Sequence, residues 1–80
     1  MMLTIAPINQ NLYVEKIKGK DEVRKHLSGL GFVEGAQINV VSEVNGNLIV
    51  NVKNTRIAIG RSLSNRVIVS TKEGKENDNA

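Results

Sequence analysis

Cysteine is absent from this 80-residue chain, which excludes both a disulfide framework and a metal site built on thiolates. No apolar run approaches the roughly 20 residues that a membrane-spanning helix requires, so we expect no membrane span. The amino terminus also lacks a charged region followed by an apolar one, so it carries no recognisable export signal. The sequence therefore favours a cytoplasmic location.

Aromatic residues are nearly absent as well, since Tyr13 and Phe32 are the only two. This scarcity leaves no stacking platform for single-stranded RNA and no aromatic-lined groove for proline-rich peptides. The formal net charge is +3, and residues 71–80 sum to −1, so residues 1–70 carry +4. That charge is too small to indicate nucleic-acid binding, and we expect no nucleic-acid partner.

Hydrophobic residues make up 40% of the chain, which is enough for one small globular domain. We assign that domain to residues 1–70. Residues 71–80 are mostly lysine, glutamate, asparagine, aspartate and glycine without periodicity, and we expect them to form a disordered polar tail.

A short helix is expected near residues 21–30, with Asp21 as its N-cap. Its apolar residues recur at i, i+4 and i+7 on one face: Val23, Leu27 and Leu30. Gly31 occupies the C′ position, where a left-handed residue ends many helices. Phe32 then takes the C″ position of a Schellman motif, which predicts that it folds back onto Leu27.

Five short β-patterned runs are predicted, at residues 11–17, 38–41, 48–53, 56–59 and 66–69. Asn45-Gly46 predicts a hairpin, because both residues accept positive φ. A second turn is expected at Asn54-Thr55, and residues 60–65 form a short irregular or single-turn connection. Since a two-sheet sandwich usually needs about seven strands, we expect a mainly β fold, an SH3-like small barrel of about five strands with one short helix. Closure of the barrel would remove exposed strand edges.

The order of these segments resembles the FeoA family, ferrous iron transport protein A and its relatives, over about residues 3–70. The matching segments are 12–19, the leucine-glycine turn at 27–35, the hairpin at 36–52, 57–61 and 67–69. The chain departs from the family pattern in three places. Glu34 replaces the usual proline of the turn, His26 replaces a common arginine, and Leu63-Ser64 stands where many members have Glu-Ala.

The resemblance implies a small cytoplasmic accessory protein of bacterial ferrous iron transport. Its implied partner is the membrane transporter FeoB, which it would contact at the cytoplasmic GTP-binding domain, peripherally at the inner face of the cell membrane. A similar domain ends the iron-dependent repressors of the DtxR type, so a metal-responsive regulatory module is an alternative. A small RNA-binding barrel is a third hypothesis.

Metal-ligating residues show no suitable pattern. His26 is the only histidine, and one imidazole cannot build the three- or four-ligand site that a transition metal prefers. The carboxylates show no ligand spacing: Glu15, Asp21, Glu22, Glu34 and Glu43. We therefore expect no cofactor and no dedicated iron site, with Fe2+ as the cargo of the implied transporter.

The candidate partner-binding residues lie in the last third of the chain: Arg56, Arg61, Leu63 and Arg66. The arginines either form a solvated face or dock an acidic partner surface or an anionic lipid headgroup. Leu63 either closes the bottom of the barrel or contributes to an apolar docking pocket. No paired carboxylates or nucleophile–base motif indicates catalysis, so we do not expect an enzyme.

Overall fold

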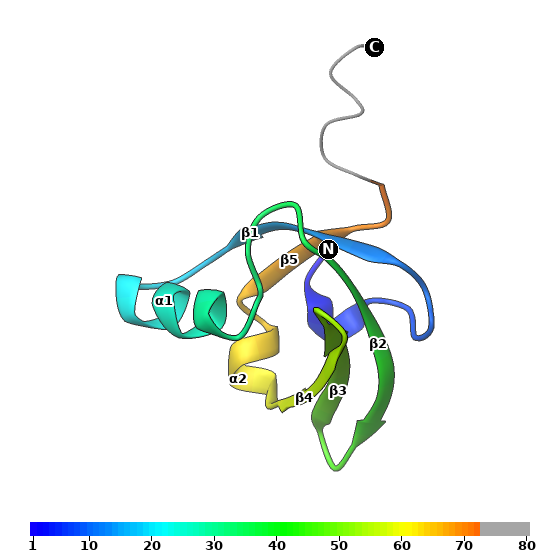
Figure 1. Cartoon of the computed structure of the whole chain (residues 1–80). Helices are drawn as coiled ribbons and strands as arrows, with labels where there is room; N and C mark the ends of the chain where they lie inside the picture. The colour runs from blue at the N-terminus through cyan, green and yellow to red at the C-terminus, as the bar shows by residue number, and fades with distance from the viewer. Residues whose placement is uncertain (73–80) are drawn as a thin grey trace.

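Five antiparallel strands form one strongly curved sheet in the computed structural model, which describes residues 1–72 (Figure 1). The elements, in chain order, are η1 (Leu3–Ile5), β1 (Leu12–Ile17), α1 (Asp21–Gly29), β2 (Gln37–Val44), β3 (Asn47–Val52), β4 (Thr55–Ile59), α2 (Arg61–Ser64) and β5 (Val67–Ser70). The strand order is β4-β3-β2-β1-β5. The predicted mainly β fold with one short α-helix is confirmed. The predicted disordered tail lies, from residue 73 onward, outside the described residues.

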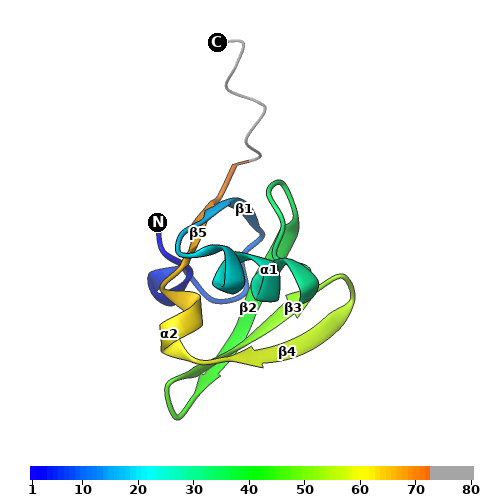
Figure 2. The ribbon, with the colours of Figure 1, turned by 90° about the vertical axis from the view of Figure 1, so that its left-hand side faces the viewer.

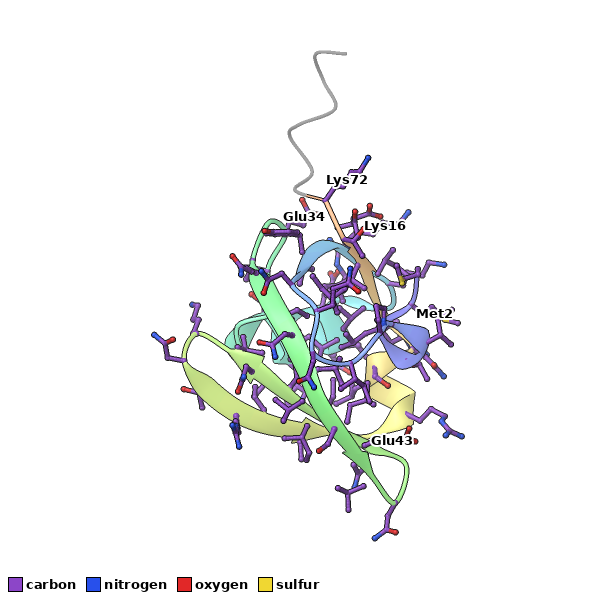
Figure 3. The ribbon with its side chains drawn as sticks, turned by 90° about the vertical axis from the view of Figure 1, so that its right-hand side faces the viewer. Met2, Lys16, Glu34, Glu43 and Lys72 are labelled. Atoms are coloured by element: carbon purple, nitrogen blue, oxygen red, sulfur yellow. The ribbon has the colours of Figure 1, made fainter. Side chains whose placement is uncertain are left out.

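The core lies inside the curve of the sheet and is built by alternation along the strands. In β3 every second residue is buried, and the residues between are half-buried or exposed on the outer face. The buried apolar residues form one cluster: Leu3, Leu12, Val14, Leu27, Phe32, Ile38, Val40, Leu48, Val50, Val52, Ile59, Val67 and Val69. Strand β2 is long and runs from the 31–36 loop, which contains Glu34, to the β2–β3 hairpin next to Glu43 (Figure 3).

Both tight hairpins have two residues with positive φ. Asn45 and Gly46 have φ of 52° and 85°, which confirms the first predicted turn. The second turn was predicted at Asn54-Thr55 and is wrong by one residue, because Lys53 and Asn54 take the positive φ values of 54° and 64°. Thr55 instead begins β4 and pairs with Val52, so a two-residue loop closes this hairpin too.

Helix α1 begins one residue earlier than the predicted N-cap implies. Lys20, with extended backbone, is its N-cap, and no side chain caps the helix there. Asp21 is the first helical residue, so the predicted N-cap is wrong, although its carboxylate still lies at the positive end of the helix dipole. The C-terminal prediction is confirmed: the Gly31 N–H donates to Ser28 O at 3.0 Å and the Phe32 N–H to Leu27 O at 3.0 Å, which is the Schellman pattern.

The two outer strands of the sheet, β4 and β5, are not paired with each other within residues 1–72. The expectation of full closure is therefore wrong, because the single-turn helix α2 connects the two strands instead. One edge is nevertheless covered: the Val69 N–H donates to Met1 O at 2.7 Å, and Met2 bridges Ile68. The following η1, which the sequence did not predict, lies against α2 and β5 and buries Leu3 completely (Figure 2).

Candidate partner-binding site

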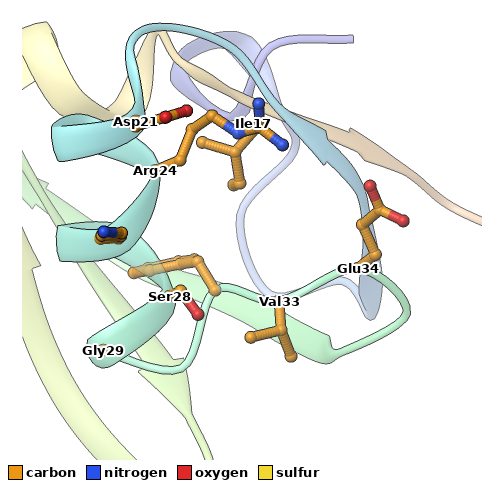
Figure 4. Close-up of a pocket in the computed structure, with 9 residues that line it drawn as sticks. Ile17, Asp21, Arg24, Ser28, Gly29, Val33 and Glu34 are labelled. Atoms are coloured by element: carbon orange, nitrogen blue, oxygen red, sulfur yellow. The ribbon is translucent and has the colours of Figure 1, made fainter.

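A groove of about 660 Å³ runs between α1 and the loop of residues 31–36 (Figure 4). Ile17 and Val33 provide its accessible apolar surface, and the buried Phe32 lies beneath them. The other lining residues are polar or small: Asp21, Arg24, Lys25, Ser28, Gly29 and Glu34. Arg24 extends from α1 toward Ile17 of β1, and Glu34 lies on the wall away from the helix. We call this hollow the helix groove.

Both walls of the helix groove are fixed by backbone hydrogen bonds. The Schellman turn fixes the path of the chain as it leaves α1. The loop is then tied to β1, since the Gly35 N–H donates to Val14 O at 2.8 Å and the Val14 N–H donates to Ala36 O at 3.0 Å. Phe32 is completely buried below this loop, whereas Val33 is 39% exposed. The groove is therefore a preformed feature of the fold.

The helix groove combines apolar contact area with charges of both signs. Asp21 and Glu34 balance Arg24 and Lys25 in its lining. An arrangement of this kind suits an apolar side chain from a protein partner, with charged residues at the rim to orient it.

The four residues predicted to bind a partner lie on two different surfaces of the structure. Arg61 and Leu63 lie in α2 and Arg66 follows it, whereas Arg56 lies near the start of β4. Leu63 is half-buried and packs against the core. Arg61 approaches Glu43 at 4.0 Å in an exposed ion pair, which contributes little to stability.

Arg66 extends toward the connection between β1 and α1, where its Nη1 lies 3.5 Å from the position that a Cβ on Gly19 would take. Arg61, Leu63 and Arg66 thus lie in or directly after α2, and we call these three residues the α2 group. Arg56 belongs to a different surface, on the outer face of the sheet.

That second surface is a polar groove of about 620 Å³ across β2, β3 and β4. Its lining residues are Gln37, Ile38, Asn39, Asn51, Lys53, Asn54 and Arg56. Three of them form a hydrogen-bonded row across the strands: Arg56 Nε donates to Asn51 Oδ1 at 3.3 Å, and Asn51 Nδ2 donates to Asn39 Oδ1 at 3.4 Å. We call this surface the amide groove. These two asparagines were not singled out from the sequence, where they were only placed within the predicted strands at residues 38–41 and 48–53.

Residues 1–72 show no group of three or more histidine, aspartate or glutamate side chains that could hold a metal ion. His26 lies in the last turn of α1 and is exposed. Over the same residues, the longest helices are too short and too polar to cross a membrane.

The family model described as the FeoA domain matches residues 1–71. A protein of Methanocaldococcus jannaschii named as Fe(2+) transport protein A is 31% identical over 77 residues, which cover 95% of this chain and 94% of that protein. The crystal structure of an iron uptake regulatory protein, FeoA, has 30% identity and a TM-score of 0.80, over 86% of this chain and 93% of the other.

The crystal structure of Stenotrophomonas maltophilia FeoA in complex with zinc has 30% identity and a TM-score of 0.76, over 88% of this chain and 89% of the other. It is described as a prokaryotic SH3 domain protein. The small SH3-like fold predicted from the sequence is thus shared with proteins that match nearly the whole chain.

Proposed function

The chain belongs to the FeoA family, and we propose that it is an accessory protein of ferrous iron transport. It acts by binding the cytoplasmic GTP-binding region of a FeoB-type transporter. The family match over residues 1–71 is the observation that carries this proposal. Two relatives support it by their descriptions, one as an Fe(2+) transport protein and the other as a candidate activating factor of bacterial ferrous iron transport.

The helix groove supports a function in protein–protein binding. Its walls are held by backbone hydrogen bonds, so little conformational freedom is lost when a partner binds. Val33 offers an exposed apolar contact at its edge, and Arg61 and Arg66 supply charges that steer association more than they add affinity. We propose the helix groove as the main contact and the α2 group, including Leu63, as its periphery.

Fe2+ is, in this proposal, the cargo of the transporter and needs no resident site on this chain. Equilibrium dialysis of the purified protein against Fe2+ under anaerobic conditions tests this part. Retention of one equivalent at micromolar Fe2+ would contradict it.

Calorimetric titration with the purified GTP-binding region, without nucleotide and with GDP or a non-hydrolysable GTP analogue, tests the partnership. Val33→Asp places a charge at the helix groove and is expected to weaken binding at least ten-fold, or roughly 1.4 kcal/mol. Val44→Asp is the matched control, because Val44 is 51% exposed at the β2–β3 hairpin. Equal binding by both variants would reject the groove as the contact, and no association in any nucleotide state would reject the partnership itself.

A further inference from the structure

The amide groove has a hydrogen-bonding pattern that favours ligands rich in acceptors. Within its row, the oxygens of Asn51 and Asn39 both accept hydrogen bonds from the neighbouring strand. Among the side-chain hydrogen bonds of residues 1–72, none uses the Asn39 Nδ2 or the Arg56 Nη groups as donors. The row therefore presents unused N–H groups at both of its ends, on β2 and on β4.

The charge of the amide groove has one sign. Lys53 and Arg56 are cations, the other side chains of the lining are neutral, and the lining contains no carboxylate. Lys53 lies in the tight turn with φ of 54°, and its exposed side chain passes beside Gly31, with Cδ 3.6 Å from the position that a Cβ there would take. A ligand that fits this surface must supply both negative charge and hydrogen-bond acceptors.

We propose that the amide groove binds an acidic, extended segment of a protein partner through its carboxylates. Arginine pairs with carboxylates through two parallel hydrogen bonds, and such charge-assisted bonds are stronger than neutral ones. The two ends of the row are separated by two strand spacings, about 10 Å. Acidic residues at alternate positions of an extended chain project about 7 Å apart on one face, and the flexible glutamate side chains can span the remaining ~3 Å to reach both ends.

The observations favour a protein segment over a nucleic acid. Single-stranded nucleic acids bind mainly by base stacking on aromatic residues within a basic groove. Phe32 is completely buried and Tyr13 lies on β1, and neither lines the amide groove. The inference stands whether or not the FeoB-type transporter is the partner, because it rests only on the groove.

Fluorescence anisotropy with a blocked, labelled peptide of alternating glutamate and serine tests the inference, with the glutamine–serine peptide as the neutral comparison. The double variant Lys53→Asn with Arg56→Gln removes both cations, and asparagine accepts the positive φ at position 53. We expect the acidic peptide to bind the native protein and to lose at least ten-fold in affinity with this variant.

The matched control is Lys16→Gln with Lys72→Gln, which removes two exposed cations that lie near each other away from the amide groove (Figure 3). Both double variants lower the net charge of +3 by the same amount. Unchanged binding by the control supports the inference. Equal loss in both variants, no binding of the acidic peptide to the native protein, or tighter binding of polyuridine at the same groove would each overturn it.

Discussion

The backbone N–H of Phe32 donates to the carbonyl oxygen of Leu27 at 3.0 Å, and both side chains are completely buried in the same core. One turn of chain therefore ends α1, anchors the core and forms the floor of the helix groove.

Truncation of Phe32 is expected to remove much of the stability of the domain. Phe32→Ala should lower the free energy of unfolding by about 3–5 kcal/mol, because it deletes the largest fully buried side chain and leaves a cavity. Urea denaturation followed by circular dichroism measures this change. Val33→Ala, one residue along and 39% exposed, should cost less than about 1 kcal/mol. Similar losses at both positions would contradict the assignment of Phe32 to the core.

Two glycines at the end of α1 should respond to alanine in opposite directions. Gly31 has φ of +108°, and a Cβ there would lie 2.6 Å from Cγ1 of Val52. Gly31→Ala should therefore destabilise the protein by at least about 2 kcal/mol. Gly29 is helical and has no atom within 4 Å of an added Cβ, so Gly29→Ala should stabilise by roughly 0.4–1 kcal/mol. Thermal unfolding of the two variants and of the native protein measures the sign of each change in stability.

The two hairpin turns predict a reciprocal pair of substitutions. Lys53 and Asn45 hold the same position in their turns, with φ of 54° and 52°, and asparagine tolerates this backbone better than lysine does. Lys53→Asn should stabilise the domain by up to about 1 kcal/mol, and Asn45→Lys should destabilise it by a similar amount. Denaturant midpoints measure both. A loss of stability in Lys53→Asn would show that packing of the Lys53 side chain outweighs the backbone preference.

Ser64 is the only buried polar side chain of residues 1–72, and it links α2 to the amino-terminal segment. Its hydroxyl lies 3.0 Å from Thr4 Oγ1 and 3.4 Å from the Arg61 carbonyl oxygen. A double-mutant cycle with Ser64→Ala and Thr4→Val should give a coupling free energy of about 0.5–1.5 kcal/mol. The control pair, Ser64→Ala with Ser70→Ala, shares no hydrogen bond and should be additive. Additivity in the first cycle as well would show that the hydroxyl contact contributes nothing.

The strands and the end of α1 could be predicted from the sequence because each depends on local chemistry. Alternating apolar residues identified β3, and Asn45-Gly46 fixed its hairpin with β2. Gly31 and Phe32 identified the Schellman turn because two adjacent residue types are enough to predict it. Glycine accepts the left-handed backbone, and phenylalanine supplies the apolar C″ residue. The predicted N-cap of α1 was wrong because Asp21 has a preferred capping side chain, whereas the backbone places Lys20, which makes no capping hydrogen bond, at that position.

The amide groove could not be predicted because it depends on a register shift. A regular two-residue hairpin at Asn45-Gly46 would pair Val40 with Asn51, which places an inward residue opposite an outward one. The irregularity between Val40 and Ser42 moves the pairing to Val40 with Val50, and so Asn39 comes to face Asn51. Neither the position of that bulge nor the hydrogen bond to Arg56 is visible in local sequence.

The amino-terminal segment was missed for a similar reason. Leu3 is completely buried, yet the residues that follow it, with Pro7 and the polar positions 9–11, show no helical or strand periodicity. Its place is set by pairing with β5, at the other end of the chain. Among the predicted partner-binding residues, sequence proximity grouped Arg56 with Arg61, but Arg56 lies near the start of β4 and faces the amide groove, whereas Arg61 begins α2 and approaches Glu43.

Because residues 1 and 2 pair with the outside of β5, β4 is the terminal strand of the sheet whose outer side has no strand partner within residues 1–72. Two native molecules can then pair their β4 strands about a twofold axis. This pairing cannot continue into a fibre, since each molecule has one terminal strand available for it. Concentrated samples should stop at a dimer in native mass spectrometry, and removal of the first two residues should allow longer oligomers.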